Sequence, residues 1–238
     1  MDDIYDKILE LPLFQGISKQ KLEGMIASAK FNFIKYTQYS SIARRGTNYT
    51  NIKFIISGRI KTEHSTPDEK IRITQEIAAP HVIAPHFLFG INTRYPYNIY
   101  ALEETSVMEI DKPTLISLMH YDDIFLLNML NITSAPSQKA YISAPFISLG
   151  SVVEKLAYWV QNSTNKKAEN INIYCRLKDL YTFFGVQRSS YMYTMEKLKE
   201  AKIIDSDANK ITILDRETLV SVLHQEDNDT NNISYSVY

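Results

Sequence analysis

The stretch RLKDLYTFFGVQRSSYMYTMEKLKEAKIIDSDANKITI, residues 176–213, decides the fold of this 238-residue chain. Its apolar residues recur at helical spacing on both sides of Gly185, which favours two short helices joined by a glycine turn. Residues 203–213 then alternate around a polar turn, as a β-hairpin does. Two helices around a tight turn, followed by a hairpin, are typical of a winged helix-turn-helix.

Each of these two helices has an apolar stripe that is expected to be buried. The stripe residues are Leu177, Leu180 and Phe184 in the first helix and Tyr191, Met195 and Leu198 in the second. This pattern predicts that the first turns of the second helix expose Arg188, Ser189, Met192 and Tyr193.

The exposed first turns of such a helix contact base edges in the DNA major groove. Arg188 is the candidate for base readout, because its planar fork matches two acceptors of guanine. The other candidates for contacts with bases or phosphates are Lys178, Gln187, Ser189, Ser190, Tyr193 and Lys210. The alternative is that all of them are solvated polar residues on a small helical pair.

Charge and composition limit the function classes. Apolar residues make up 45% of the chain and charged residues 22%, which predicts a packed core rather than global disorder. The net charge is −1, although residues 149–224 hold 11 basic and 9 acidic side chains. A weakly basic DNA-binding part predicts modest non-specific affinity for DNA.

The single cysteine, Cys175, excludes an internal disulfide and cannot alone hold a structural zinc or an iron–sulfur cluster. We expect a small core residue in a reducing compartment. No apolar run has the length of a membrane span, and the acidic start lacks the features of a secretory signal. These observations predict a soluble cytoplasmic protein without a membrane partner.

The preceding residues alternate between helical and β-rich patterns. Residues 4–28 are expected to be helical, with breaks at Pro12 and Gly16. Six short runs predict an antiparallel sandwich or roll. These runs are residues 31–36, 52–56, 59–63, 71–77, 97–102 and 106–110.

A central helical region follows. Asp111 can cap a helix that has Pro113 in its first turn, and residues 122–132 are apolar on most sides. Such a helix needs apolar partners, so it either dimerises or is wedged between two domains. Pro136 and Pro145 predict a break or kink within residues 133–147, and an amphipathic helix is expected over 147–161.

Several segments along the chain resemble the CRP/FNR family of bacterial regulators, the cyclic-AMP receptor protein and its relatives. LPLFQGIS at 11–18 looks like the opening helix and turn of that family, FIISGRIK at 54–61 is similar to its central strand, and GVQRSS at 185–190 resembles its recognition helix. The resemblance implies an α+β fold that contains a cyclic-nucleotide-binding-domain-like β-roll, a dimer helix and a winged helix-turn-helix.

The implied parts are a β-roll sensor with N-terminal helices at 1–120, a dimerisation region at 121–147, a DNA-binding domain at 148–224 and a flexible tail at 225–238. The resemblance also implies a homodimeric transcription regulator that binds a palindromic operator in double-stranded DNA. RNA polymerase would be a further partner, and a small effector would switch the affinity for DNA.

The chain departs from the family in the segment that would hold a cyclic nucleotide. Ala84-Pro85 stands where the family has Gly-Glu, and Tyr95-Pro96 stands where it has Arg-Ser, with Arg94 one position out of register. A shift of one residue on a strand moves a side chain to the opposite face. Prolines also have no amide hydrogen for a phosphate. We therefore predict no cyclic-AMP binding in the family manner and no cofactor.

Aromatic residues are concentrated around the expected effector pocket. Either they bind an apolar or aromatic effector, or they fill the roll and no ligand exists. The candidate pocket residues are Ala84, Pro85, Phe87, Arg94, Tyr95, Pro96 and Tyr97.

A cupin-like metal enzyme and a protein-interaction module are the alternatives to the regulator. A cupin-like metal enzyme would use clustered histidines, but His81 and His86 are five positions apart and lack a supporting glutamate motif. We therefore expect that the protein is not an enzyme and has no catalytic residue and no metal site. The remaining alternative is a protein-interaction module that uses the helix-turn-helix as a contact surface.

Overall fold

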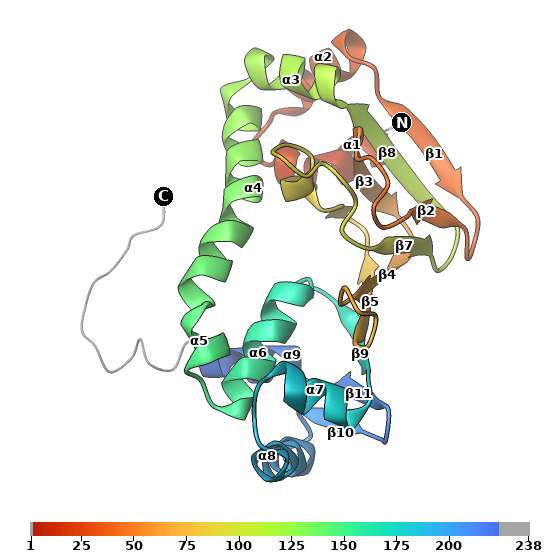
Figure 1. The fold of residues 1–238 in the computed structure, drawn as a ribbon. Coiled ribbons are helices and arrows are strands. Elements are labelled where there is room, and N and C mark those ends of the chain that lie inside the picture. The colour runs from red at the N-terminus through yellow and green to blue at the C-terminus, as the bar shows by residue number, and fades with distance from the viewer. Residues whose placement is uncertain (1, 224–238) are drawn as a thin grey trace.

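The computed structural model describes residues 2–223 (Figure 1). The prediction of a flexible tail at 225–238 lies outside these residues. The chain forms a two-sheet roll at residues 32–111, a long helix beside it, and a C-terminal part at residues 150–223, here called the head.

The N-terminal segment forms α1 (Asp2–Leu9), the short 3₁₀ helix η1 (Pro12–Phe14) and α2 (Lys19–Ser28). The predicted breaks are confirmed, because Pro12 begins η1 and Gly16 adopts a left-handed φ of 79°. The Phe14 ring lies edge-on to Phe54 at 5.9 Å and to Phe125 at 5.3 Å. This contact joins the N-terminal segment to the roll and to the long helix.

The roll has two antiparallel sheets, with strand orders β1-β8-β3-β6 and β5-β4-β7-β2. All six predicted strands are present, whereas the very short β2 and β6 were not predicted. The elements are β1 (Asn32–Tyr36), β2 (Ser41–Ala43), β3 (Asn51–Ser57), β4 (Arg59–Ser65), β5 (Arg72–Ala78), β6 (His81–Val82), η2 (Pro85–Phe87), β7 (Asn98–Ala101) and β8 (Thr105–Asp111).

Three helices connect the roll to the head: α3 (Lys112–Tyr121), α4 (Asp123–Ser143) and α5 (Pro145–Ser148). Asp111 caps α3, as predicted. The predicted break within residues 133–147 is confirmed at Ala144, which separates α4 from α5, but Pro136 does not interrupt α4. Packing near both ends of α4 explains this, because Phe125 and Met129 are buried against the roll and Ser143 is buried near the head. Within residues 2–223, no helix combines the length and apolar character that crossing a bilayer requires.

Asp122 begins α4 and joins it to α2. Its Oδ1 accepts a hydrogen bond from the Phe125 amide at 3.0 Å, and its Oδ2 lies 2.7 Å from Lys21 Nζ. Burial raises the pKa of Asp122, but the hydrogen bonds from Lys21 and Phe125 outweigh it and leave the pKa below its usual value. The charged form therefore stabilises the fold.

Asp122→Ala is expected to lower the free energy of unfolding by about 1–2 kcal/mol through loss of the helix cap. Because the folded-state pKa is depressed, this contribution is present above the unfolded-state pKa of about 3.9 and is lost as the pH falls through the lower folded value. Urea denaturation at pH 7 and pH 3 measures the difference. Asp122→Asn keeps the cap and should cost less at pH 7; equal losses for both variants would contradict the capping role.

The head packs around a hydrophobic core that is separate from the core of the roll. Its elements are α6 (Val152–Ser163), β9 (Glu169–Tyr174), α7 (Leu177–Phe183), α8 (Arg188–Glu200), β10 (Ile204–Ser206), β11 (Lys210–Ile213) and α9 (Arg216–Ser221). The predicted hairpin is confirmed as β10–β11. The helix predicted over 147–161 corresponds to α6, but its predicted start at 147 is wrong. Ser151 and Glu154 form a capping box that fixes the first turn of α6 at Val152.

One pairing was not predicted. Strand β11 pairs with β9, and β9 also pairs with β5 of the roll. The second sheet of the roll therefore continues into the head as a seven-stranded sheet of order β10-β11-β9-β5-β4-β7-β2.

Candidate nucleic-acid interface

Helices α7 and α8 are joined by a tight turn at Gly185, which adopts a left-handed φ of 63°. The Val186 amide donates to the Tyr181 carbonyl at 3.0 Å and closes this turn. The predicted stripes are buried, with Leu177 only half-buried. The fully buried stripe residues are Leu180, Phe184, Tyr191, Met195 and Leu198.

The residues predicted to face outward from α8 are exposed. They are Arg188, Ser189, Met192 and Tyr193, together with Gln187 and Ser190. Gln187 occupies the cap position but makes no side-chain capping bond, so its side chain leaves the amides of the first turn uncapped. Within residues 2–223, the Arg188 guanidinium makes no ion pair or hydrogen bond. The start of α8 thus offers free amides and a free guanidinium to an anionic surface.

The other basic candidates lie away from the first turn of α8. Lys178 is exposed on α7. Lys210 is half-buried on β11, and its Nζ lies 6.0 Å from the centre of the Tyr174 ring. These positions suit contacts with DNA phosphates rather than base readout.

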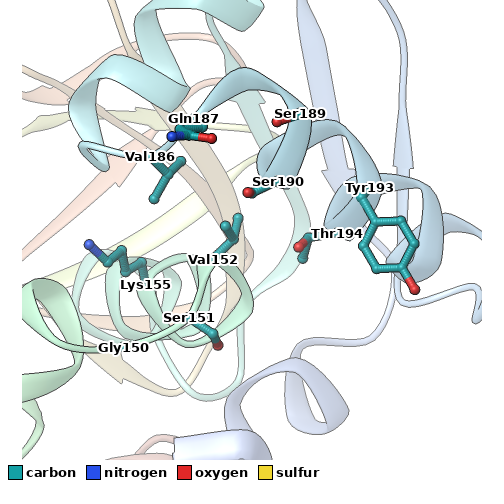
Figure 2. A pocket seen from close by; sticks show the side chains of 10 residues that line it. All are labelled: Gly150, Ser151, Val152, Lys155, Val186, Gln187, Ser189, Ser190, Tyr193 and Thr194. Carbon is teal, nitrogen blue, oxygen red and sulfur yellow. The ribbon is translucent and has the colours of Figure 1, made fainter.

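An open groove of about 670 Å³ separates α8 from α6 (Figure 2). The hydroxyls of Ser190 and Thr194 lie on the side of α8 that faces α6, while the Tyr193 ring points away from α6. Four predicted residues therefore meet here: Gln187, Ser189, Ser190 and Tyr193. The lining residues are Gly150, Ser151, Val152 and Lys155 from the α6 side and Val186, Gln187, Ser189, Ser190, Tyr193 and Thr194 from the α8 side.

Sequence reasoning missed the α6 wall of this groove. Lys155 is 8% exposed, and its Nζ donates to the Phe184 carbonyl at 3.1 Å, which ties the end of α7 to α6. A Cβ at Gly150 would lie 2.5 Å from the Phe146 carbonyl oxygen, so only glycine fits there. The capping-box spacing of Ser151 and Glu154 was the signal in the sequence that could have located this wall.

Tyr181 on α7 lies against α8. Its ring is half-buried and lies 6.2 Å from the ring of Tyr191 on α8. The Tyr191 hydroxyl is buried and has no hydrogen-bond partner among residues 2–223. Burial accordingly raises the pKa of Tyr191.

Tyr191→Phe is expected to raise the free energy of unfolding by about 1 kcal/mol, because it removes a buried polar group that lacks a partner. Urea denaturation of the full chain measures this change. The matched control is Tyr49→Phe, which should destabilise the protein because the Tyr49 hydroxyl donates to the Ile83 carbonyl. A loss of stability in Tyr191→Phe equal to that in the control would contradict the expectation.

In the roll, tyrosine side chains lie beneath the turn that precedes η2. Ala84 adopts a left-handed φ of 39° at this turn and is buried. Tyr49 bonds the carbonyl of Ile83, and the Tyr97 hydroxyl is hydrogen-bonded to the backbone of Ala84. The Tyr95 ring stacks on Tyr49 with centres 4.3 Å apart. The side chains of Tyr49 and Tyr97 therefore contact this turn from inside the roll.

The remaining candidate pocket residues do not form an anion site. Arg94 is exposed, and its guanidinium donates to the Gly46 carbonyl at 2.9 Å. Pro85 is buried, whereas Phe87 and Pro96 are half-buried. Burial raises the pKa of Tyr97 to about 12. This arrangement favours the alternative in which aromatic rings fill the roll.

Metal-ligating groups are dispersed in the described part of the chain. No three histidine, cysteine, aspartate or glutamate side chains among residues 2–223 could hold one metal ion. Cys175 is buried, and burial raises the pKa of its thiol to about 11. A protonated, enclosed thiol fits the predicted core role.

The family model of the cyclic nucleotide-binding domain matches residues 33–122. The catabolite activator protein of Thermus thermophilus superposes with a TM-score of 0.53 at 13% identity, over 90% of this chain and 99% of that one. The fold of this chain therefore resembles that of the catabolite activator protein.

Two further solved structures resemble the chain less closely. FixK2 from Bradyrhizobium japonicum has a TM-score of 0.45 and 13% identity, over 80% of this chain and 96% of that one. A CooA variant from Carboxydothermus hydrogenoformans has a TM-score of 0.45 and 16% identity, over 81% and 88%. None of the curated proteins matches the sequence.

Proposed function

We propose that this CRP/FNR-like chain is a transcription regulator that binds double-stranded DNA through a winged helix-turn-helix in the head. The observation that carries the proposal is the free first turn of α8, where exposed Arg188 follows an uncapped helix start at Gln187. Helix α8 would enter the major groove, and the groove beside α6 would receive the DNA backbone. The protein would act in the cytoplasm as a regulator, not as an enzyme, and RNA polymerase would be a further partner.

The exposed side of α4 supports a homodimer. Phe125 and Met129 face the roll, whereas Leu127 and Leu130 on the other side are 58% and 54% exposed. Tyr141, further along α4, is 83% exposed. These three side chains lie on one side of α4 at the spacing of a helix–helix contact. A second copy of the chain would cover them, and two heads related by a two-fold axis would read a palindromic operator.

Selection of DNA tests the proposal. Full-length protein would be used to recover duplexes from sheared genomic DNA, and the bound fragments would be sequenced. We expect a two-fold symmetric motif with half-sites about one helical turn apart. Recovery of fragments without a shared motif, at every salt concentration used, would contradict the regulator.

We expect no binding of cyclic AMP or cyclic GMP by the full-length protein in titration calorimetry. The phosphate would lack charged donors, since Arg94 is bonded to Gly46 and Pro85 and Pro96 have no amide hydrogen. Tyr49 and Tyr97 already contact the turn, and Tyr95 stacks on Tyr49. Micromolar affinity for either nucleotide would refute this expectation. A cyclic-AMP-binding protein measured in the same buffer serves as the positive control.

A protein-interaction module remains the second candidate, and the small positive charge of the head favours it. Residues 149–224 have two more basic than acidic side chains, which is little for a DNA-binding domain. Substitution of Arg188 on α8 separates the two functions.

A further inference from the structure

The head is attached to the roll at a second place besides the covalent connection through α5. Strands β5 and β9 form an antiparallel ladder in which Arg72 is opposite Tyr174, Ile73 opposite Ile173 and Thr74 opposite Asn172. About ninety residues of chain separate the two strands, so the ladder is a tertiary contact. We call this contact the β5–β9 clamp.

Apolar packing reinforces the clamp. Ile71 and Ile73 lie in the β4–β5 hairpin of the roll, yet both are 3% exposed and belong to the hydrophobic core of the head. In that core they join Leu156 of α6 and Ile173 of β9. The roll therefore supplies part of the interior of the head, and separating the two parts would expose these side chains to water.

Polar contacts also cross the boundary. The side-chain oxygen of Gln75, which is 7% exposed, accepts from the Asn165 amide at 2.7 Å. Asn170 Nδ2 donates to Glu76 at 2.9 Å. Arg59 contacts Glu76 of the roll at 3.2 Å and Glu169 of the head at 2.6 Å. Gln75 would lose its partner if the head moved away, which makes separation costly.

The clamp lies far from the surface proposed to bind DNA. Helix α8 lies on the side of the head that is remote from the roll, and its first turn is exposed while the clamp is formed (Figure 1). The clamped arrangement thus leaves the reading residues accessible. Two attachments, one through α5 and one through β5–β9, fix the orientation of α8 relative to α4.

We propose that the β5–β9 clamp holds the head in the orientation that binds DNA, so that Ile71, Ile73 and Gln75 are positioning residues for DNA recognition. This inference rests on the proposed function. Without the clamp, the head would pivot about residues 144–151, and binding would have to select one orientation among several. The apparent affinity for DNA is proportional to the fraction of molecules that hold the competent orientation.

A cysteine pair tests whether the clamped state binds DNA. Arg72→Cys and Tyr174→Cys would be combined with Cys175→Ser in the full chain, because directly opposed strand residues lie within disulfide range. The probe is a duplex recovered by the wild-type protein. We expect the disulfide to form under mild oxidation and the DNA affinity to stay unchanged. Loss of affinity on oxidation, restored by reduction, would overturn the proposal.

Loosening the clamp is the complementary test. Ile73→Thr keeps a β-branched residue in the strand but removes apolar packing from the head, and we expect about tenfold weaker DNA binding. The amides of residues 169–174 should also exchange faster with solvent. The matched control is Ile99→Thr, which is buried in the core of the roll and should leave the affinity unchanged. Equal affinities for both variants would overturn the proposal.

These results separate the clamp from the proposed function. A protein that binds DNA but does not form the disulfide contradicts the clamp alone. A wild-type protein that recovers no shared duplex, while the cysteine variant still forms the disulfide, contradicts the regulator, and with it the assignment of the clamp to DNA recognition.

Discussion

Arg188→Ala is expected to weaken binding of the selected duplex by about 10–100-fold, the loss associated with one bidentate arginine–guanine contact. The contacted base should become less strictly required in a competition assay. The fold should be unaffected, because Arg188 is exposed and makes no hydrogen bond or ion pair within residues 2–223. Fluorescence anisotropy with a labelled duplex measures the affinity, and circular dichroism checks the fold.

Two variants make this result specific. Arg188→Lys keeps the charge but loses the planar fork, so it should also relax the sequence preference. Lys202→Ala removes an exposed positive charge beyond the other end of α8 and should change the affinity only slightly. If Arg188→Ala bound the duplex as tightly as wild type, the head would instead fit the protein-interaction module.

Simultaneous Leu127→Asp and Leu130→Asp substitutions are expected to convert the dimer to a monomer. In the monomer these positions on α4 are more than half exposed, so the fold tolerates charge there. In the dimer the same carboxylates would be buried against one another without partners, which is strongly unfavourable. A monomer reads one half-site, and losing the second contact is expected to lower the operator affinity by about 10²–10⁴-fold.

Sedimentation equilibrium measures the oligomeric state of these variants. The matched control is Phe33→Asp on β1, because Phe33 is 49% exposed but lies on the roll away from α4. The control should remain dimeric and bind DNA normally. A wild-type protein that is monomeric at micromolar concentration, or an α4 variant that remains dimeric, would contradict the assignment of this surface.

Regular elements could be predicted from the sequence because each has its own apolar period. The stripe of α8 through Tyr191, Met195 and Leu198 specifies both its buried side and its exposed side. The exposure of Arg188 follows directly from that period. The turn at Gly185 was equally visible, because a left-handed residue there strongly favours glycine.

Contacts between distant segments could not be read in the same way. Nothing in residues 72–78 or 169–174 alone specifies that these strands pair with each other, because any exposed strand offers the same backbone groups. The α6 wall of the groove was missed for the same reason, since Gly150 and Lys155 act through partners elsewhere in the chain. The sequence could not show which of the two prolines ends the helix, because the effect of a proline depends on packing; α4 runs through Pro136 and ends before Pro145.

The aromatic residues of the roll were visible in the sequence, but their role was not. Composition alone cannot show whether Tyr95 and Tyr97 line a space or occupy it. The stacking of Tyr95 on Tyr49 and the hydrogen bond that Tyr97 accepts from the backbone of Ala84 favour occupation. Only side-chain placement distinguishes these two states.

The shared sheet also determines how this protein can be divided. A fragment that began near residue 148 would lose Ile71 and Ile73 from its interior and would uncover the whole length of β9. An uncovered, apolar edge strand recruits strands from other molecules. The C-terminal fragment is therefore expected to self-associate or aggregate when it is expressed alone.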